Sequence, residues 1–263
     1  MKHLISLTLI LLTANLTRAH ISYVARDLGT YDPLVVRSVA LMSNTVSSDF
    51  GWASGTDANG GDSHKVRAFK FVMAAPGTVT IQVQGLAFDR SGVPIAALGL
   101  PGFSVYRGLA HESPAQGDHD SSVISALWND TTYGAGNWQG SFRALGDWKI
   151  GNDDGATFAD LSSFTYMGNA ADGTSAEYGG ATGIFGDGNA DGMVIHTLTL
   201  DPGAYSIFVG GSKYYDLLNN GGNTGTFGFS LTVATVPELS SGTLLMAGLA
   251  AIAAARRRIR RPV

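Results

Sequence analysis

Short runs of alternating polar and apolar residues, divided by Pro-Gly turns, direct this chain toward strands and away from helices. Residues 66–73 place Phe69, Phe71 and Met73 on one face, and residues 78–83 alternate threonine or glutamine with β-branched residues. A period of two is the pattern of a half-buried strand. We therefore predict a hairpin in which residues 66–73 and 78–83 flank the turn Ala75-Pro76-Gly77.

The same pattern of short strands separated by Pro-Gly turns recurs along the chain. We predict a strand at 103–106 after Pro101-Gly102, two strands at 196–200 and 204–209 around Pro202-Gly203, and a last strand at 225–234. No segment between residues 20 and 235 keeps a helical period over ten residues. The predicted fold is all-β, a β sandwich or jelly roll with long Gly/Asp/Asn-rich loops. The strand and turn pattern is similar to that of bacterial secreted β-sandwich modules, including the prepeptidase C-terminal type.

The first nineteen residues have the layout of a secretory signal peptide. Lys2 is followed by the apolar run Leu4 to Leu12, and the segment ends on Thr17-Arg18-Ala19. The run is shorter than the roughly 20 residues that a membrane-spanning helix needs. We predict cleavage by signal peptidase after Ala19, so that the mature chain begins at His20. The alternative is an ordinary buried N-terminal helix.

The C-terminus has a second three-part layout. Val236, Pro237 and Glu238 precede a short polar spacer and the uncharged stretch from Thr243 to Ala255. A basic cluster then follows, made of Arg256, Arg257, Arg258, Arg260 and Arg261. We predict a short transmembrane helix whose arginines stay on the cytoplasmic side, where Lys and Arg accumulate.

Residues 236–263 resemble the PEP-CTERM sorting signal, although Leu239 stands where the second proline of the motif usually lies. The resemblance implies that an exosortase-type protease in the inner membrane cuts near Pro237-Glu238 and releases the protein outward. It also implies a Gram-negative bacterium that makes extracellular polysaccharide. The alternative is a permanent C-terminal anchor with a basic stop-transfer.

Between the two signals, residues 20–235 are predicted to form a single exported domain. Removing residues 1–19 and 238–263 lowers the 17 Lys and Arg by seven and the 21 Asp and Glu by one, which leaves a net charge near −10. This charge repels phosphate backbones and excludes nucleic acid as an expected partner. Because the chain has no cysteine, no disulfide stabilises the fold.

The sharpest local motif is Asp187-Gly188-Asn189-Ala190-Asp191-Gly192, which matches the start of an EF-hand-like calcium loop. Asp187, Asn189 and Asp191 are the candidate calcium ligands. The twelfth position is Leu198 instead of a bidentate glutamate, so a complete EF-hand is excluded. Two interpretations remain: a truncated calcium loop completed by distant ligands, or a β-turn rich in Asp and Gly. Residues 152–155, Asn-Asp-Asp-Gly, are a second candidate of the same kind.

Cleavage after Ala19 would give His20 both a free α-amino group and an imidazole. With a second imidazole these nitrogens form a histidine brace, the copper-binding arrangement of lytic polysaccharide monooxygenases and of some copper-carrying sandwiches. The candidates for the second ligand are His64, His111, His119 and His196. Alternatively, the histidines are turn and surface residues, since no spacing motif connects His20 to a partner.

Two other groups permit both a functional and a structural interpretation. His111-Glu112 and Asp118-His119-Asp120 combine imidazole and carboxylate in one loop, which suits a metal site, an acid/base pair or a solvated loop. Trp52, Trp128, Trp138 and Trp148 are candidates for a sugar-binding platform or for core packing.

Together these features predict a non-enzymatic cell-surface or extracellular-matrix protein that associates with exopolysaccharide. The alternative is a secreted polysaccharide-active or copper-binding protein built on His20.

Overall fold

The computed structural model describes seven stretches of the chain: residues 20–33, 40–53, 59–111, 118–119, 142–151, 157–213 and 223–236. The predicted signal peptide and everything after Val236, including Pro237, Glu238 and the arginine cluster, lie outside these residues. Within the described stretches, no helix has the length and apolar character needed to cross a membrane.

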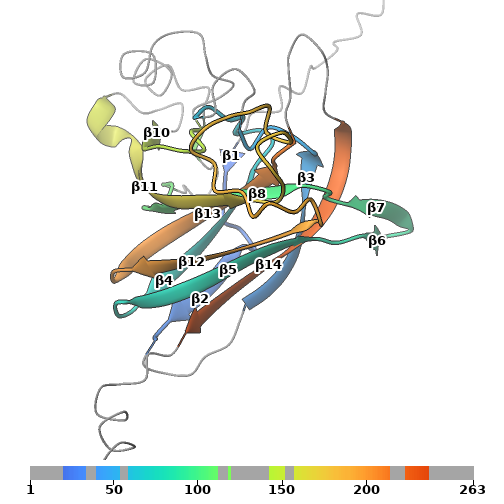
Figure 1. Ribbon diagram of the computed structural model, residues 1–263. Helices are drawn as coiled ribbons and strands as arrows, with labels where there is room; N and C mark the ends of the chain where they lie inside the picture. The colour runs from blue at the N-terminus through green and yellow to red at the C-terminus, as the bar shows by residue number, and fades with distance from the viewer. Residues whose placement is uncertain are drawn as a thin grey trace, which may run out of the picture.

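Two large sheets and one short ladder make up the described residues (Figure 1). The first sheet has the strand order β10-β11-β8-β13-β4-β2 and contains β2 (Asp27–Tyr31), β4 (Arg67–Met73), β8 (Pro101–Arg107), β10 (Trp148–Ile150), β11 (Ser162–Ala171) and β13 (Gly203–Gly211). The second has the order β12-β5-β14-β7-β6 with β3 also paired to β14, and contains β3 (Ala40–Ser48), β5 (Gly77–Gly85), β6 (Phe88–Arg90), β7 (Val93–Ala97), β12 (Met193–Leu200) and β14 (Thr224–Val236). The ladder pairs β1 (His20–Ile21) with β9 (Asp118–His119), and a 3-10 turn, η1 (Phe158–Asp160), is the one helical element that the described stretches contain. The predicted all-β class is confirmed, and the architecture is consistent with a β sandwich.

The predicted hairpin at residues 66–83 is wrong. The two predicted strands exist as β4 and β5, but β4 pairs with β13 and β2 whereas β5 pairs with β12 and β14. Pro76-Gly77 therefore turns the chain from one sheet into the other. Pro202-Gly203 does the same between β12 and β13, and the two corners adjoin, because Met73 pairs with Gly203 and Gly77 with Leu200.

These corners explain why the sequence pattern was misleading. Alternation fixes which side of a strand is apolar, but both the hairpin and the sheet-crossing corner satisfy that pattern. A Cβ atom at Gly77 would lie 2.3 Å from Cγ of Pro33, so a residue with a side chain does not fit at this corner.

The main core lies between the two sheets. Along β5, Val79, Ile81 and Val83 are fully buried while the intervening residues are half-buried, as the alternation predicts. They belong to one cluster with residues of the first sheet, among them Phe69, which contacts Phe229 of β14 edge to face at 5.9 Å. This cluster joins the sheets face to face.

A second, aromatic core covers the outer face of the first sheet. Strand β8 is buried at six consecutive residues, because this sheet is covered on both faces. Trp148 stacks on Phe164 at a centroid distance of 4.5 Å, and Nε1 of the fully buried Trp52 donates to Oγ of Ser104 at 2.9 Å. The core interpretation is thus confirmed for Trp52 and Trp148, whereas Trp128 and Trp138 lie outside the described residues.

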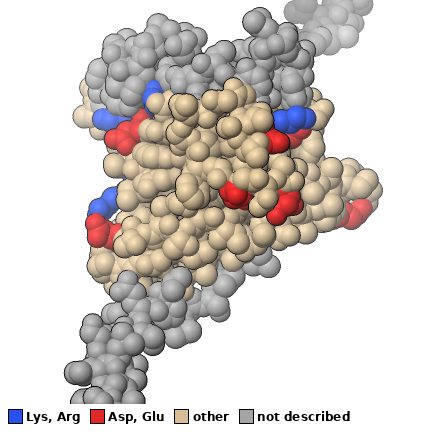
Figure 2. Space-filling view, in the orientation of Figure 1, with Lys and Arg blue, Asp and Glu red and all other residues tan. Residues whose placement is uncertain are grey.

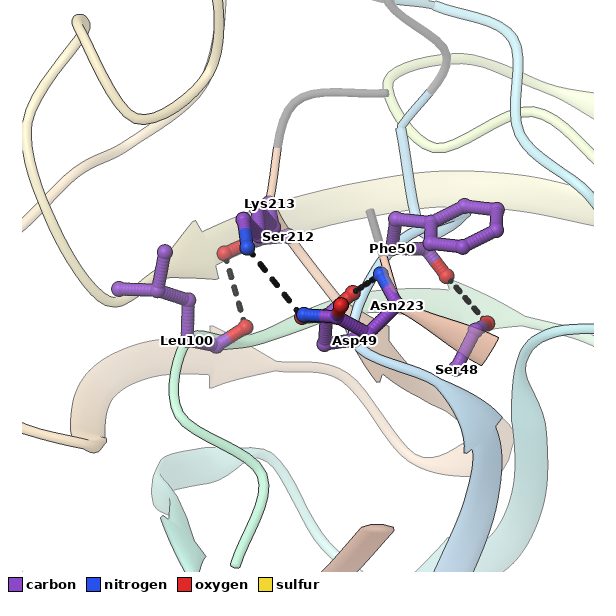
Figure 3. Close-up of polar contacts among 7 residues, drawn as sticks. All are labelled: Ser48, Asp49, Phe50, Leu100, Ser212, Lys213 and Asn223. Carbon is purple, nitrogen blue, oxygen red and sulfur yellow. Dashed lines mark hydrogen bonds and ion pairs between the residues drawn. The ribbon is translucent and has the colours of Figure 1, made fainter. Parts of the chain in front are cut away.

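Asp49 fastens three strand ends together (Figure 3). It follows β3, and its carboxylate accepts hydrogen bonds from the backbone amide of Asn223 at 2.6 Å and from Nδ2 of Asn223 at 2.9 Å. Nζ of Lys213 lies 3.5 Å from the same carboxylate. Since Lys213 follows β13 and Asn223 precedes β14, one nearly buried side chain joins both sheets at this end of the sandwich.

Candidate metal centres

Three aspartates meet where β11 ends and β12 begins. Asp172 directly follows β11, and Asp191 lies two residues before β12. Asp187 lies beside the end of β11, since its amide donates to the carbonyl of Ala171 at 3.3 Å. Carboxylate oxygens of Asp172, Asp187 and Asp191 all lie within 4.8 Å of one another. Because β11 and β12 belong to different sheets, this aspartate cluster spans one edge of the sandwich.

Backbone amides hold each carboxylate in place. Asp172 accepts from the amides of Asp191 at 3.0 Å and Gly192 at 2.7 Å, one through each oxygen. Oδ1 of Asp187 accepts from Gly173 and Asn189, both at 3.1 Å. Oδ1 of Asp191 accepts from Met193 at 3.1 Å. The hydrogen bonds of Asp187 and Asp191 thus occupy only one oxygen of each carboxylate.

Glycines let the loop turn back toward Asp172. Gly188 has φ of 87° and Gly192 has φ of 82°, in the left-handed region that residues with a Cβ atom rarely adopt. These turns follow Asp187 and Asp191 directly. Gly192 stands at the sixth position of the motif, where an EF-hand loop has the glycine of its sharp turn.

Burial of Asp172 disfavours the charged form of its carboxylate. Asp172 has no exposed surface, and desolvation raises its pKa to about 6, with the nearby charges of Asp187 and Asp191 adding to the rise and the two amide hydrogen bonds opposing it. Asp187 and Asp191 are exposed. A buried carboxylate beside two others is a site that a positive charge would stabilise.

The residues of the cluster fit a hard cation. Calcium binds carboxylate and carbonyl oxygens at about 2.3–2.6 Å, so two bonds to one ion span oxygens about 4.8 Å apart. The structure shows that Asp172, Asp187 and Asp191 could hold a metal ion.

Asp172 was missed by sequence analysis, although Asp187 and Asp191 were named. Its only local signal is the pair Asp172-Gly173, and Asp-Gly pairs recur elsewhere in this sequence. The third predicted ligand, Asn189, is exposed and is fixed through its backbone amide. The second candidate loop, residues 152–155, lies outside the described residues.

The N-terminal end of the predicted mature chain lies against the segment that carries His119. Strands β1 and β9 are antiparallel, and their register pairs His20 with His119 and Ile21 with Asp118. In an antiparallel pair, the Cα atoms of opposite residues are about 4.5–5.5 Å apart. The structure therefore brings together His20 and one of its four predicted partners.

The residues after His20 fasten this strand to the first sheet. Ile21 and Tyr23 are buried in the aromatic core. The hydroxyl of Tyr23 lies 2.6 Å from Oγ of Ser206 in β13 and accepts from the amide of Ala110 at 3.1 Å. Ala110 follows β8, so Tyr23 links the N-terminal segment to the stretch of chain that leads toward β9.

The other three histidines take part in different local structures. Nδ1 of His64 lies 2.9 Å from Oδ1 of Asp62 in a turn before β4. His111 is exposed, and its backbone amide donates a hydrogen bond to Oγ of Ser162 at 2.7 Å. His196 lies in β12, packs on Phe185 at 4.6 Å between ring centroids, and has its pKa lowered by burial. Neither Glu112 nor Asp120, the carboxylates predicted to accompany His111 and His119, is among the described residues.

Charge is sparse on the visible face of the described residues. Figure 2 shows acidic and basic atoms in small separate groups on a surface that is mostly uncharged. This face has no continuous basic patch of the kind that binds nucleic acid.

Comparisons with known proteins give no family. No protein-family model matches the chain, and no curated protein matches it. Among solved structures, CorA, a surface-associated copper-binding protein important in copper acquisition by Methylomicrobium album BG8, is 14% identical and aligns with a TM-score of 0.49 over 82% of this chain and 98% of CorA. MopE, a secreted protein of Methylococcus capsulatus whose copper binding is facilitated by an oxidized tryptophan, is 12% identical and aligns with a TM-score of 0.42 over 80% of this chain and 99% of MopE. At this level of similarity, a shared function does not follow.

Proposed function

We propose that this protein is an exported, non-enzymatic surface or matrix module whose β sandwich is stabilised by calcium bound at Asp172, Asp187 and Asp191. The observation that supports the proposal is the convergence of these three carboxylates at one edge of the sandwich. Asp172 supplies the distant ligand that the truncated loop motif lacked. Oxygen atoms from carboxylates, together with carbonyls and water, are what calcium prefers in proteins.

The proposed location of the module outside the cell rests on the sequences of its two ends. A signal peptide at residues 1–19 and a PEP-CTERM-like tail at 236–263 are the basis for export, for a transient stage in the inner membrane, and for release by an exosortase. Association with extracellular polysaccharide follows from the same resemblance. Calcium at millimolar concentration outside the cell would match the weak affinity, about 10⁻⁴–10⁻³ M, of extracellular calcium modules.

The test is thermal unfolding of the mature protein in a chelator and in about 10 mM calcium. If the dissociation constant is near 10⁻⁴ M, binding to the folded state alone adds about 2.7 kcal/mol. For a domain of this size that free energy raises Tm by about 5–10 °C. Equal melting curves in calcium and in chelator would refute calcium binding by the folded protein.

The structure offers well-matched variants for this test. In Asp187→Asn and Asp191→Asn the Oδ1 atom that accepts the backbone hydrogen bonds is kept, while the charge is removed. Each should abolish most of the calcium-induced rise in Tm. Asp89→Asn is the control, because Asp89 also accepts a backbone hydrogen bond in an exposed turn, from Gly92 at 2.7 Å, but lies outside the cluster. A response lost in Asp89→Asn as well would point to a general charge effect.

The second candidate function is copper binding at the N-terminus, the alternative built on His20. One observation favours it: among the four possible partner histidines, the register of β1 and β9 places His119 opposite His20. This candidate uses a different part of the molecule from the aspartate cluster, so the two functions are compatible.

A further inference from the structure

We infer that the outer face of the second sheet binds a neutral polysaccharide through hydroxyl and amide side chains. The inference rests on the polysaccharide association of the proposed function and deepens it, because it names the binding surface and the class of ligand. We call this surface the polar face, and it is defined by six side chains of three adjacent strands: Thr80, Gln82, Gln84, Thr197, Ser230 and Thr232 (Figure 1).

The period of the strands turns these side chains away from the core. Thr80 and Gln82 of β5 alternate with valine and isoleucine residues that are fully buried between the sheets. Ser230 and Thr232 alternate in the same way with buried residues of β14. Because successive side chains of a strand point to opposite faces of its sheet, these four lie on the outer face. On the neighbouring strand β12, Thr197 is exposed.

The pairing of the strands brings the polar side chains together in rows. Thr80 lies opposite Thr197 of β12, and their hydroxyl oxygens are 3.1 Å apart. Gln82 lies opposite Thr232 of β14. Neighbouring strands are about 4.7–4.9 Å apart, which is close to the length of one residue in an extended glycan. A glycan that crosses the strands would therefore meet a polar side chain of each strand in turn.

The strands that form this side of the sandwich carry no charged residue. Strands β3, β5, β12 and β14 contain no Asp, Glu, Lys or Arg, although 14% of the residues in the chain are charged. A polymer that carries carboxylates or phosphates is bound through Lys and Arg, which pair with those groups. The polar face offers no such partner, so it fits an uncharged polymer.

The side chains of the polar face match the chemistry of sugar hydroxyls. Serine and threonine hydroxyls and the glutamine amide each donate and accept hydrogen bonds, as every hydroxyl of a sugar does. A second copy of the chain is a poorer match, because the cores of stable protein interfaces are apolar. The one large apolar side chain of β12 that is exposed is Ile195, at 46%.

An aromatic ring lies at one end of the polar face. Gly228 occupies the outward position two residues before Ser230 in β14, and a Cβ atom there would lie 2.6 Å from Cε1 of Phe88. Phe88 begins β6, and it is half-buried, so part of its ring stays accessible. Ligand sites combine apolar side chains with a few polar groups that fix orientation. Phe88 thus supplies an apolar contact for the C–H groups of a sugar ring beside the hydroxyl and amide rows.

The experiment uses the exported mature protein, with both ends checked by intact mass. The labelled protein is incubated with an array of neutral and uronate-containing polysaccharides, and the strongest neutral ligand is then titrated by calorimetry. The expected result is binding to neutral polysaccharides and none to polyuronates. Because the polar face has no charge for salt to screen, the affinity should be equal at low and high ionic strength.

The rows of the polar face provide well-matched variants. Thr80→Val with Thr197→Val removes both hydroxyls of one pair, keeps the β-branched shape and leaves neither partner unsatisfied. It should weaken binding about tenfold, which is the scale of lost neutral hydrogen bonds. Gln82→Met, which keeps the length of the side chain, should also weaken binding. Thr30→Val is the control, because Thr30 is an exposed strand threonine of the first sheet, and it should bind like wild type. Thermal unfolding of each variant checks that the fold is kept.

Four outcomes would overturn the inference. They are no binding to any neutral polysaccharide, binding to polyuronates alone, unchanged affinity in both polar-face variants, and a dimer in sedimentation that these variants break. The last would make the face a contact between copies of the chain. The calcium response is measured separately through Tm. Loss of glycan binding with that response intact would overturn this inference alone, and the reverse result would overturn the calcium proposal alone.

Discussion

Asp172 accepts a hydrogen bond from the backbone amide of Asp191 at 3.0 Å, while the carboxylates of the same two residues lie within 4.8 Å of each other. The backbone of the loop is therefore drawn toward a buried charge that repels the side chains of that loop. Protonation of Asp172 or binding of a cation would relieve this repulsion. Each of these events should therefore change the unfolding free energy of the protein measurably.

The first prediction concerns pH in the absence of metal. The pKa of Asp172 is raised from 3.8 to about 6 in the folded protein, so the folded state binds more protons than the unfolded state between these values. The stability that the raised pKa of Asp172 contributes is fully present below its unfolded pKa of 3.8. It is lost as pH rises through the folded pKa of about 6. The unfolding free energy of the wild type minus that of Asp172→Asn, measured by urea denaturation in a chelator, should fall by about 2 kcal/mol from pH 4 to pH 7. A difference that does not vary with pH would contradict the shift.

The second prediction links pH to calcium. A proton on Asp172 competes with the cation, because both are bound by the same carboxylate. The calcium-induced rise in Tm should therefore be smaller at pH 5 than at pH 7.5. The two rises are measured in otherwise identical buffers, and equal values would mean that Asp172 is not a ligand.

The third prediction concerns Asp49, whose carboxylate accepts hydrogen bonds from Asn223 and forms an ion pair with Lys213. Asp49→Ala leaves these donors without their acceptor and should lower the unfolding free energy by about 1–3 kcal/mol. Asp49→Asn keeps an oxygen for the Asn223 amide and should cost less. Urea denaturation of both variants measures the difference, and an equal loss in the two would assign the effect to the ion pair with Lys213.

The fourth prediction concerns the processed ends. The released protein should begin at or near His20 and end near Pro237-Glu238. Replacing Arg256, Arg257, Arg258, Arg260 and Arg261 by neutral residues should weaken the membrane orientation and leave the precursor uncut. Intact-mass measurement of protein from the medium or outer surface is the assay. A released species that still carried residues 240–263 would instead favour a plain C-terminal anchor.

Sequence patterns predicted the strands better than their partners. The apolar alternation of Val79, Ile81 and Val83 is a local property, and β5 lies where it was predicted. The assignment of β4 and β5 to different sheets depends on long-range pairing with β13 and β14, which alternation does not encode.

The candidate sites show the same limit. Asp187 and Asp191 are close in sequence and carry a motif, so they were identified, whereas Asp172 reaches them through the path of β11. His119 was one of four equal candidates until the β1 and β9 register distinguished it. In both sites the missing information was tertiary.

Strand β14 ends at Val236, the residue immediately before the proposed cutting site, and it lies between β3 on one side and β5 with β7 on the other. In the proposed membrane-held precursor, a pull on the C-terminal tail would act along this strand. Hydrogen bonds to β3 and β5 would then be loaded together in shear instead of being opened one after another. The proposed tether would thus be attached at a mechanically resistant point of the sandwich, and traction on the tail would leave the domain folded until the proposed cleavage released it.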